Sequence, residues 1–231
     1  MVVSNRFGFS PFLLIGDHAG QAIPRKLGDL GLPPGAIDKH IAWDIGVSGY
    51  GRALARRLDA CFVEQVYSRL VLDCNRVPGA ADAAPEVSDG ITVPGNVGLA
   101  ADAMAQRRAE IYDPYNAAIA SAAGGRRVLV SLHSFTPVMK GFVRPWRFGV
   151  LHSHDSPLSL RLLGLLREAF GDDVVGDNQP YAMDGTDNTV PLHAPRFDDY
   201  VEIEVRQDLV ADEAGQGEIA ALLARILPQL L

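Results

Sequence analysis

The amino-acid sequence predicts an α/β fold, a three-layer sandwich in which helices cover both faces of a mixed, mainly parallel sheet. Two observations predict it. Short apolar runs typical of strands alternate along the chain with longer segments whose apolar residues recur at helical spacing, which indicates βαβ units. The length of 231 residues lies within the range of one α/β domain, so we expect residues 1–231 to form a single domain.

The first half of the chain begins this alternation. Strands are expected at residues 11–16, 61–66 and 70–74. Between the first two, residues 46–60 predict an amphipathic helix with Leu54 and Leu58 on one face. Residues 77–96 have no helical or strand period and are rich in Pro, Gly, Ala and Asp, so they predict a long loop. Such a loop is either a lid or binding loop, or a tolerated surface insertion.

The second half continues it. Residues 99–123 predict a helix in which Pro114 forces a break or kink, because proline lacks the N–H that a helix interior needs. Residues 127–132 are the most strand-like run of the chain. Residues 156–171 predict a helix with Ser156 as its N-cap. The remaining elements are expected strands at residues 147–153, 172–178 and 200–205, and a final helix at residues 217–231.

Composition and charge narrow the function. Hydrophobic residues make up 48% of the chain and charged residues 21%, as in a globular protein. The formal net charge of -7 argues against nucleic-acid binding, and an anionic substrate would need local Arg or Lys. The sequence contains neither a signal peptide nor an apolar run of the roughly 18 residues that span a membrane. Cys61 and Cys74 are expected as reduced thiols, in a cytoplasmic protein.

Candidate ligands of a metal follow two of the predicted strands. Asp17 and His18 come directly after the first strand, and His133 follows residues 127–132. Ligands bind outside the carboxyl ends of parallel strands, so the two histidines converge if their strands are neighbours. Histidine with a carboxylate is a ligand set for catalytic Zn²⁺, which leaves a fourth position for water. The alternative is that Asp17 caps a turn and hydrogen-bonds to His18.

The strand at residues 200–205 carries charged side chains on one face. Alternation places Glu202, Glu204 and Arg206 together, opposite three apolar residues. Charges in a sheet buried on both faces are costly unless they are paired, so an internal Glu–Arg pair is one explanation. The other makes one glutamate the general base that accepts a proton from water.

Arginines near residues 70–74 are candidate clamps for a substrate carboxylate. Arg69 precedes this run, and Asp73, Asn75 and Arg76 lie at its end. The guanidinium group binds both oxygens of a carboxylate at once. Salt bridges to Asp73 or to surface carboxylates would also explain these arginines.

Further histidines are distributed along the chain. His40 and Asp44 are four residues apart, and Asp44 is a candidate third metal ligand. His193 lies in an expected loop and is a candidate contact to substrate. The pair His152 and His154 is interpreted as surface or capping chemistry. The sequence contains no G-x-S-x-G elbow, P-loop, G-x-G-x-x-G or H-E-x-x-H motif.

Eight motifs together resemble one known family. In chain order they are GDHAGQAIP, HIAWDIG, YSRLVLDCNR, PGN, LHSFTP, RPW, GDNQPY and EIEVRQDL. They resemble the N-formylglutamate amidohydrolase family and span nearly the whole chain. The resemblance implies the phosphorylase/hydrolase-like α/β sandwich that is shared with zinc exopeptidases such as carboxypeptidases. It also implies hydrolysis of N-formyl-L-glutamate to glutamate and formate, in histidine breakdown.

Similarity to the zinc carboxypeptidases also implies roles for individual residues. The similarity implies that His18 and His133 are Zn²⁺ ligands and that Glu204 is the general base. Those enzymes carry His-x-x-Glu at the first ligands, whereas this chain has Gln21 at the glutamate position. Asp17 or Asp44 is then the replacement, unless the metal site is weak or lost. The substrate-binding residues implied by the resemblance are Arg76, Arg206, Asn178 and Tyr181.

Two alternatives to the implied activity remain open. One is a zinc-dependent deacylase or peptidase for another N-acyl amino acid. The other is a metal-free binding protein on the same fold, which the replacement at Gln21 favours. In each case the expected partner is a small molecule, an N-acyl amino acid for the enzymes, and we expect neither a nucleic-acid nor a membrane partner. The sequence predicts no oligomeric state.

Overall fold

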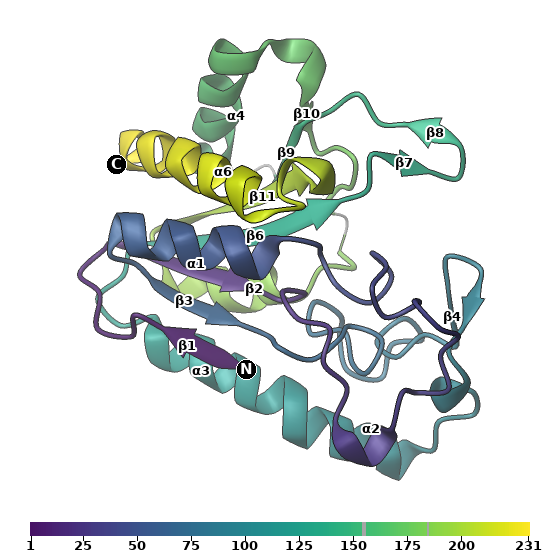
Figure 1. Ribbon diagram of the computed structural model, residues 1–231. Coiled ribbons are helices and arrows are strands. Elements are labelled where there is room, and N and C mark those ends of the chain that lie inside the picture. The colour runs from purple at the N-terminus through teal and green to yellow at the C-terminus, as the bar shows by residue number, and fades with distance from the viewer. Residues whose placement is uncertain (154–155, 184) are drawn as a thin grey trace.

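A seven-stranded sheet lies at the centre of the computed structural model, which describes residues 1–153, 156–183 and 185–231 (Figure 1). In sheet order the strands are β1 (Val2–Ser4), β3 (Cys61–Glu64), β2 (Phe12–Gly16), β6 (Val128–Phe135), β11 (Asp199–Arg206), β9 (Phe148–Leu151) and β10 (Val175–Asp177). Strands β3, β2, β6 and β11 run parallel to one another, and β9 runs parallel to β10. Two pairs are antiparallel, β1 with β3 and β9 with β11. The predicted sandwich with a mixed, mainly parallel sheet is confirmed.

Three regular helices cover one face of this sheet (Figure 1). They are α1 (Val47–Leu58), α4 (Pro157–Phe170) and α6 (Glu213–Ile226). The predicted N-cap of α4 is confirmed, because Ser156 Oγ accepts a hydrogen bond from the Ser159 amide. Buried leucines of all three helices pack on apolar strand residues, so this face is a conventional hydrophobic core.

The opposite face is covered by one long helical segment and by irregular chain. The segment comprises α2 (Ala101–Arg107), the π-helix η3 (Arg108–Tyr112) and α3 (Asp113–Ala122). Pro114 lies in the first turn of α3, so the predicted break appears as a π-helical turn rather than a gap. A short helix, α5 (Thr189–His193), completes the regular structure on this side. Much of the remaining cover comes from loops between residues 22 and 96.

The other elements are short. They are η1 (Arg25–Leu27), β4 (Val87–Ser88), β5 (Ile91–Thr92), η2 (Pro94–Asn96), β7 (Val138–Met139), β8 (Phe142–Val143), η4 (Asp172–Val174), η5 (Ala194–Arg196), η6 (Gln207–Leu209) and η7 (Leu227–Leu230). The expected loop at residues 77–96 therefore contains the small β4–β5 hairpin. His154 of the predicted His-x-His pair lies outside the described residues. No helix within those residues is long and apolar enough to cross a membrane.

The strand predicted at residues 70–74 is wrong. These residues form turns, in which the Val71 amide donates to Ser68 O and the Asp73 amide donates to Ala83 O. Leu70, Val71 and Leu72 are nevertheless buried in the core of the loop-covered face. Their apolar character reflects this burial rather than strand pairing, and a short apolar run does not distinguish the two.

Alternation along the central strands separates apolar from polar side chains. Val128, Val130 and Leu132 of β6 point into the core under the three helices, as Val201, Ile203 and Val205 of β11 do. The intervening residues point to the loop-covered face. In the parallel β6–β11 register, Ser131 pairs with Glu202 and His133 pairs with Glu204. Ser131, His133, Glu202 and Glu204 therefore gather at the carboxyl end of the loop-covered face.

Candidate active site

Three buried side chains from separate parts of the chain form the centre of the site. His18 follows β2, His133 lies near the end of β6, and Asp44 belongs to the loop before α1. One ligand atom from each lies within 4.8 Å of the other two. Because β2 and β6 are neighbours in the sheet, their carboxyl ends bring the two histidines together. The Asp44 amide donates to His18 O at 2.9 Å, which holds the loop against β2.

The His18 ring is oriented by a carboxylate. Its Nε2 lies 2.7 Å from Asp73 Oδ1, and the other oxygen of Asp73 accepts from Arg69 Nε and Nη2 at 3.0 and 2.7 Å. Its Nδ1 is buried, has no hydrogen-bond partner among the described residues, and lies 3.5 Å from Asp44 Oδ2. The nitrogen that faces the cluster is therefore Nδ1.

The His133 ring is held in a similar way. Its Nδ1 lies 3.0 Å from Asp44 Oδ2, and its Nε2 lies 3.0 Å from Ser131 Oγ. Asp17 Oδ2 and Glu202 Oε1 are each 3.9 Å from Nε2. Here too Nδ1 faces the cluster, while the other nitrogen is turned toward polar groups beneath it.

These residues fit a metal ion. Two imidazole nitrogens and a carboxylate are a usual donor set for Zn²⁺. Each histidine offers one nitrogen to the cluster and has a polar partner for the other, as metal-bound histidines generally do. His18 Nδ1 is buried and has no hydrogen-bond partner among the described residues, so its lone pair is available to bind a metal ion. His18, Asp44 and His133 therefore form a group able to hold a metal ion.

Of the two acids predicted to replace the missing glutamate, Asp44 lies in the cluster. Asp17 is buried beside it, and its Oδ1 accepts a hydrogen bond from Tyr115 Oη at 2.6 Å. Gln21 is not among the described residues that line the cavity, and its Nε2 lies 3.5 Å from Asp38 Oδ1. The third position is thus filled from a different segment of the chain.

The carboxylates around the cluster favour positive charge within it. Burial lowers the pKa of His133, but hydrogen bonding to Asp44 and the charges of Glu202 and Glu204 raise it well above its ordinary value. Burial and Arg69 lower the pKa of His18, and nearby Asp73 and Asp44 outweigh them, so that this pKa is also raised. The pKa of Asp44 is held far below its usual range, because both histidines outweigh the effect of burial.

Two glutamates lie at the carboxyl end of β11. Glu202 and Glu204 are buried, and burial is the main cause that raises the pKa of both, to about 8 for Glu202. The Oε2 atoms of both have no hydrogen-bond partner among the described residues. Arg206 instead forms its ion pair with Asp208, at 2.7 Å. A buried carboxyl whose pKa is near neutral is suited to accept and return a proton.

A cavity of about 720 Å³ opens above this centre. Its base includes the three cluster residues together with Glu202 and Glu204. Its walls come from the segment at residues 82–89, from the β7–β8 hairpin and from residues 180–182 and 186–187. The expected loop at residues 77–96 thus contributes to the pocket rather than forming a peripheral insertion.

The predicted substrate-binding residues divide into two groups. Arg69, Asn75, Arg76 and Tyr181 line the cavity. Arg206, Asn178 and His193 are not among its described lining residues. Asn178 Oδ1 accepts from the His152 amide, and buried His193 has its Nε2 2.7 Å from Asn116 Oδ1. The structure therefore does not bring these last three to the site.

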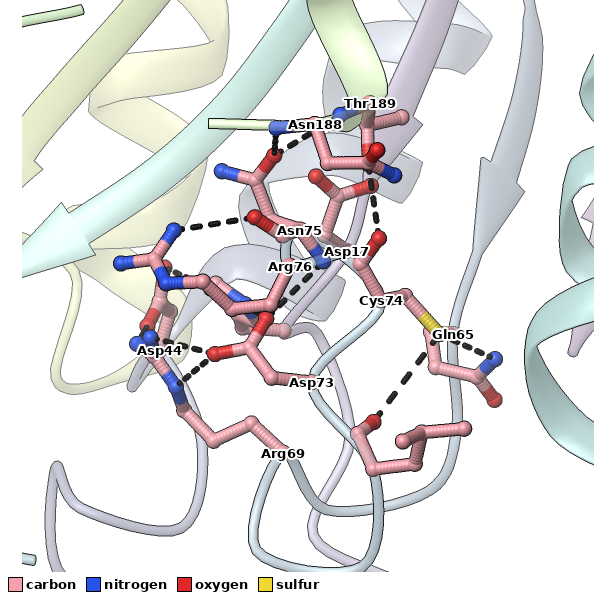
Figure 2. A network of polar contacts seen from close by, with 12 residues as sticks. Asp17, Asp44, Gln65, Arg69, Asp73, Cys74, Asn75, Arg76, Asn188 and Thr189 are labelled. Carbon is pink, nitrogen blue, oxygen red and sulfur yellow. Dashed lines mark hydrogen bonds and ion pairs between the residues drawn. The ribbon is translucent and has the colours of Figure 1, made fainter. Parts of the chain in front are cut away.

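The two cavity arginines belong to one polar network (Figure 2). Asn75 Oδ1 accepts from the backbone amides of Asn188 and Thr189, both at 2.9 Å, which ties the two walls together. Arg76 Nε donates to Asp82 Oδ2 at 2.8 Å. Sequence reasoning treated Asp73 only as a salt-bridge partner and did not name Arg144. Their positions relative to His18 and the cavity emerge from the fold.

Comparisons with known proteins agree with this picture. The family model for N-formylglutamate amidohydrolase matches residues 10–211. The crystal structure of a gene product from Agrobacterium tumefaciens is 36% identical, with a TM-score of 0.92, over 99% of this chain and 93% of that chain. No curated protein matches.

Two more distant solved structures were also found. An N-acetylmuramoyl-L-alanine amidase of Nostoc punctiforme is 14% identical, with a TM-score of 0.38, over 95% of this chain and 96% of that chain. An aspartoacylase family protein from Mesorhizobium loti is 17% identical, with a TM-score of 0.33, over 93% of this chain and 57% of that chain. The family match covers most of the chain. The chain therefore belongs to the N-formylglutamate amidohydrolase family, whose members are hydrolases that act on linear amides.

Proposed function

We propose that this protein hydrolyses the formyl amide of N-formyl-L-glutamate to glutamate and formate, with Zn²⁺ held by His18, Asp44 and His133. One observation carries the proposal: a metal-binding donor set and a buried glutamate meet at the base of a cavity that contains arginines. The family to which the chain belongs supports the substrate. The proposal includes the cytoplasmic location and the role in histidine breakdown that the resemblance implies.

The residues of the site divide the work. A bound zinc ion would supply Lewis acidity to the amide carbonyl and lower the pKa of a water molecule. Glu204 accepts the proton of the attacking water and returns it to the leaving amine. Its burial supports this role, because a carboxyl that is poorly solvated holds a proton at a pH closer to neutral.

Asp73 and Ser131 orient the two histidine ligands. Asp73 is hydrogen-bonded to Nε2 of His18, and Ser131 is hydrogen-bonded to Nε2 of His133. Both Nδ1 atoms therefore stay directed at the cluster. Arg69 anchors Asp73 and lies 3.6 Å from Asp44, which limits the negative charge around the cluster. Arg76 and Asn75 form the adjoining wall, where the α-carboxylate of the substrate lies next to the scissile amide.

The test measures zinc and formate in one preparation. We expect about one zinc per chain, formate release from N-formyl-L-glutamate, loss of that release on chelation and recovery on adding Zn²⁺. Full activity in a chelator-treated sample without zinc would refute the metal-dependent proposal. A zinc content near zero together with no hydrolysis would support the metal-free binding protein instead.

A second candidate function is deacylation of another N-acyl amino acid. The volume of the cavity, about 720 Å³, favours it, because the pocket has room for an acyl group larger than formyl. A panel of N-formyl, N-acetyl and aspartoacyl amino acids distinguishes the two. The preferred acyl group is the one with the highest kcat/KM.

A further inference from the structure

The cavity arginines differ in what they already bind. Arg69 has both its Nε and Nη2 on Asp73. Arg76 is bound to Asp82 and to two backbone carbonyl groups, and its Nη1 lies 3.7 Å from Asp187. A substrate carboxylate that approaches either one competes with carboxylates of the protein. Each is therefore partly neutralised before substrate arrives.

Arg144 is in a different situation. It follows β8 and is 6% exposed. Its Nη1 donates to Thr136 O, Thr136 Oγ1 and Tyr181 Oη, at 3.2, 3.1 and 3.2 Å. Its guanidinium carbon lies 4.9 Å from the centre of the Tyr181 ring and 5.7 Å from that of Phe135. None of the ion pairs in the described part of the chain includes Arg144.

The free edge of this guanidinium still reaches solvent. Within the described residues, Arg144 Nε and Nη2 have no hydrogen-bond acceptor. Neither of these two atoms is completely enclosed by the protein. Arg144 is not itself among the described residues that line the cavity, but it lies directly behind that wall, because its contacts Phe135, Thr136 and Tyr181 all line the cavity. A nearly buried cation without a counter-ion is costly unless an anion completes its environment.

The position of Arg144 suggests which anion this is. Arg69 and Arg76 belong to the network around Asp73, next to the metal ligand His18, which suits the α-carboxylate beside the amide. The contacts of Arg144 instead lie at a separate wall of the cavity, near Tyr181. An acidic N-acyl amino acid carries a second carboxylate at the far end of its side chain. A planar guanidinium accommodates both oxygens of that group.

We propose that Arg144 binds the side-chain carboxylate of the substrate and thereby selects acidic N-acyl amino acids over neutral ones. The inference rests on the proposed function and adds to it the residue that recognises the side chain. Tyr181 holds one edge of the guanidinium and leaves the other edge for the ligand. The proposal explains a nearly buried cation that has no ion-pair partner among the described residues and that the catalytic steps do not use.

The test compares N-formyl-L-glutamate with N-formyl-L-glutamine, which has nearly the same shape but lacks the second charge. We measure kcat/KM for both with the wild type, Arg144→Gln and Arg144→Lys. Arg144→Gln is expected to lose about 100-fold on N-formylglutamate and to change little on N-formylglutamine. Arg144→Lys, which keeps the charge but not the fork, is expected to reduce the glutamate preference about tenfold. An equal loss on both substrates would overturn the proposal.

The matched control is Arg147→Gln. Arg147 lies three residues further along, with its guanidinium over the rings of Phe148 and Phe170, which belong to the core on the helical face. This variant is expected to keep the wild-type preference. If Arg144→Gln does not fold, the wild type and Arg144→Lys decide. A wild type without preference for N-formylglutamate, or a Lys variant with an unchanged preference, contradicts the assignment.

A binding measurement separates this proposal from the proposed function. Calorimetric titration of the wild type and Arg144→Lys with both ligands reports recognition without turnover. If the wild type releases no formate but binds N-formylglutamate more tightly than N-formylglutamine, and the Lys variant loses that difference, then the proposed function fails and the role of Arg144 holds. Equal binding of the two ligands by the wild type refutes that role.

Discussion

The two faces of the central sheet are built for different purposes. The face under α1, α4 and α6 is apolar along most of β6 and β11, with polar Ser134 and Asp199 only at strand ends, and is covered by regular helices. The other face is apolar at the amino end of these strands and polar at the carboxyl end, where Ser131, His133, Glu202 and Glu204 lie. Its cover consists largely of loops, and these supply Asp44, Asp73 and the walls of the cavity. We infer that the packed helical face contributes most to the stability of the fold, whereas the loop-covered face holds the side chains of the candidate active site.

The largest expected effect is at the metal cluster. His133→Ala removes one of the three ligands, so we expect bound zinc and formate release to be lost while the helical face keeps the fold. Zinc content and circular dichroism measure the two parts separately. His152→Ala, at a histidine outside the cavity lining, is the control that should retain zinc. Zinc bound at the wild-type level in His133→Ala would show that the cluster is not the site.

Glu204→Gln tests the division within the loop-covered face. It keeps the shape of the side chain but removes the proton acceptor, so we expect zinc to remain and kcat to fall by about 100-fold or more. The control is Glu218→Gln, the same change on an exposed position of α6. A variant with zinc and unchanged kcat would assign the base to another residue, and Glu202→Gln would then be the next measurement.

Asp73→Asn tests the support of the His18 ligand. The substitution weakens the hydrogen bond at His18 Nε2, and we expect the affinity for Zn²⁺ to fall about 10- to 100-fold. Competition with a chromophoric chelator measures this in the absence of substrate. Asp82→Asn, which alters an exposed partner of Arg76, should leave the zinc affinity unchanged. Equal affinities of wild type and Asp73→Asn would limit Asp73 to a role in anchoring Arg69.

The smallest effect is expected on the helical face. A Cβ at Gly51 of α1 would lie 2.6 Å from the Phe62 ring, so Gly51→Ala is expected to lower the free energy of unfolding by about 1–3 kcal/mol. Gly164→Ala, in open space on α4, should instead raise it by about 0.5–1 kcal/mol. Denaturant unfolding measures both. KM should be unchanged in each, and a changed KM would show that the two faces are coupled.

Strand and helix periodicity predicted much of the fold. The strand at residues 127–132 and the charged alternation at residues 200–205 were both confirmed as neighbouring parallel strands. The failure at residues 70–74 has a clear cause, because irregular chain on the loop-covered face is buried as fully as a strand. Apolar composition reports burial, and over five residues it does not report backbone conformation.

For the site, the sequence alone was enough to place histidines at the carboxyl ends of two strands and two glutamates on one face of a third. Local periodicity is enough for this, because alternation and strand ends depend on neighbouring residues in the chain. Only the fold settles that Asp44, rather than Asp17, joins the cluster and that Asp73 supports His18. It also leaves Arg144 without a counter-ion among the described residues. These choices depend on contacts between residues far apart in sequence. Packing of the whole chain, and not any local pattern, brings those residues together.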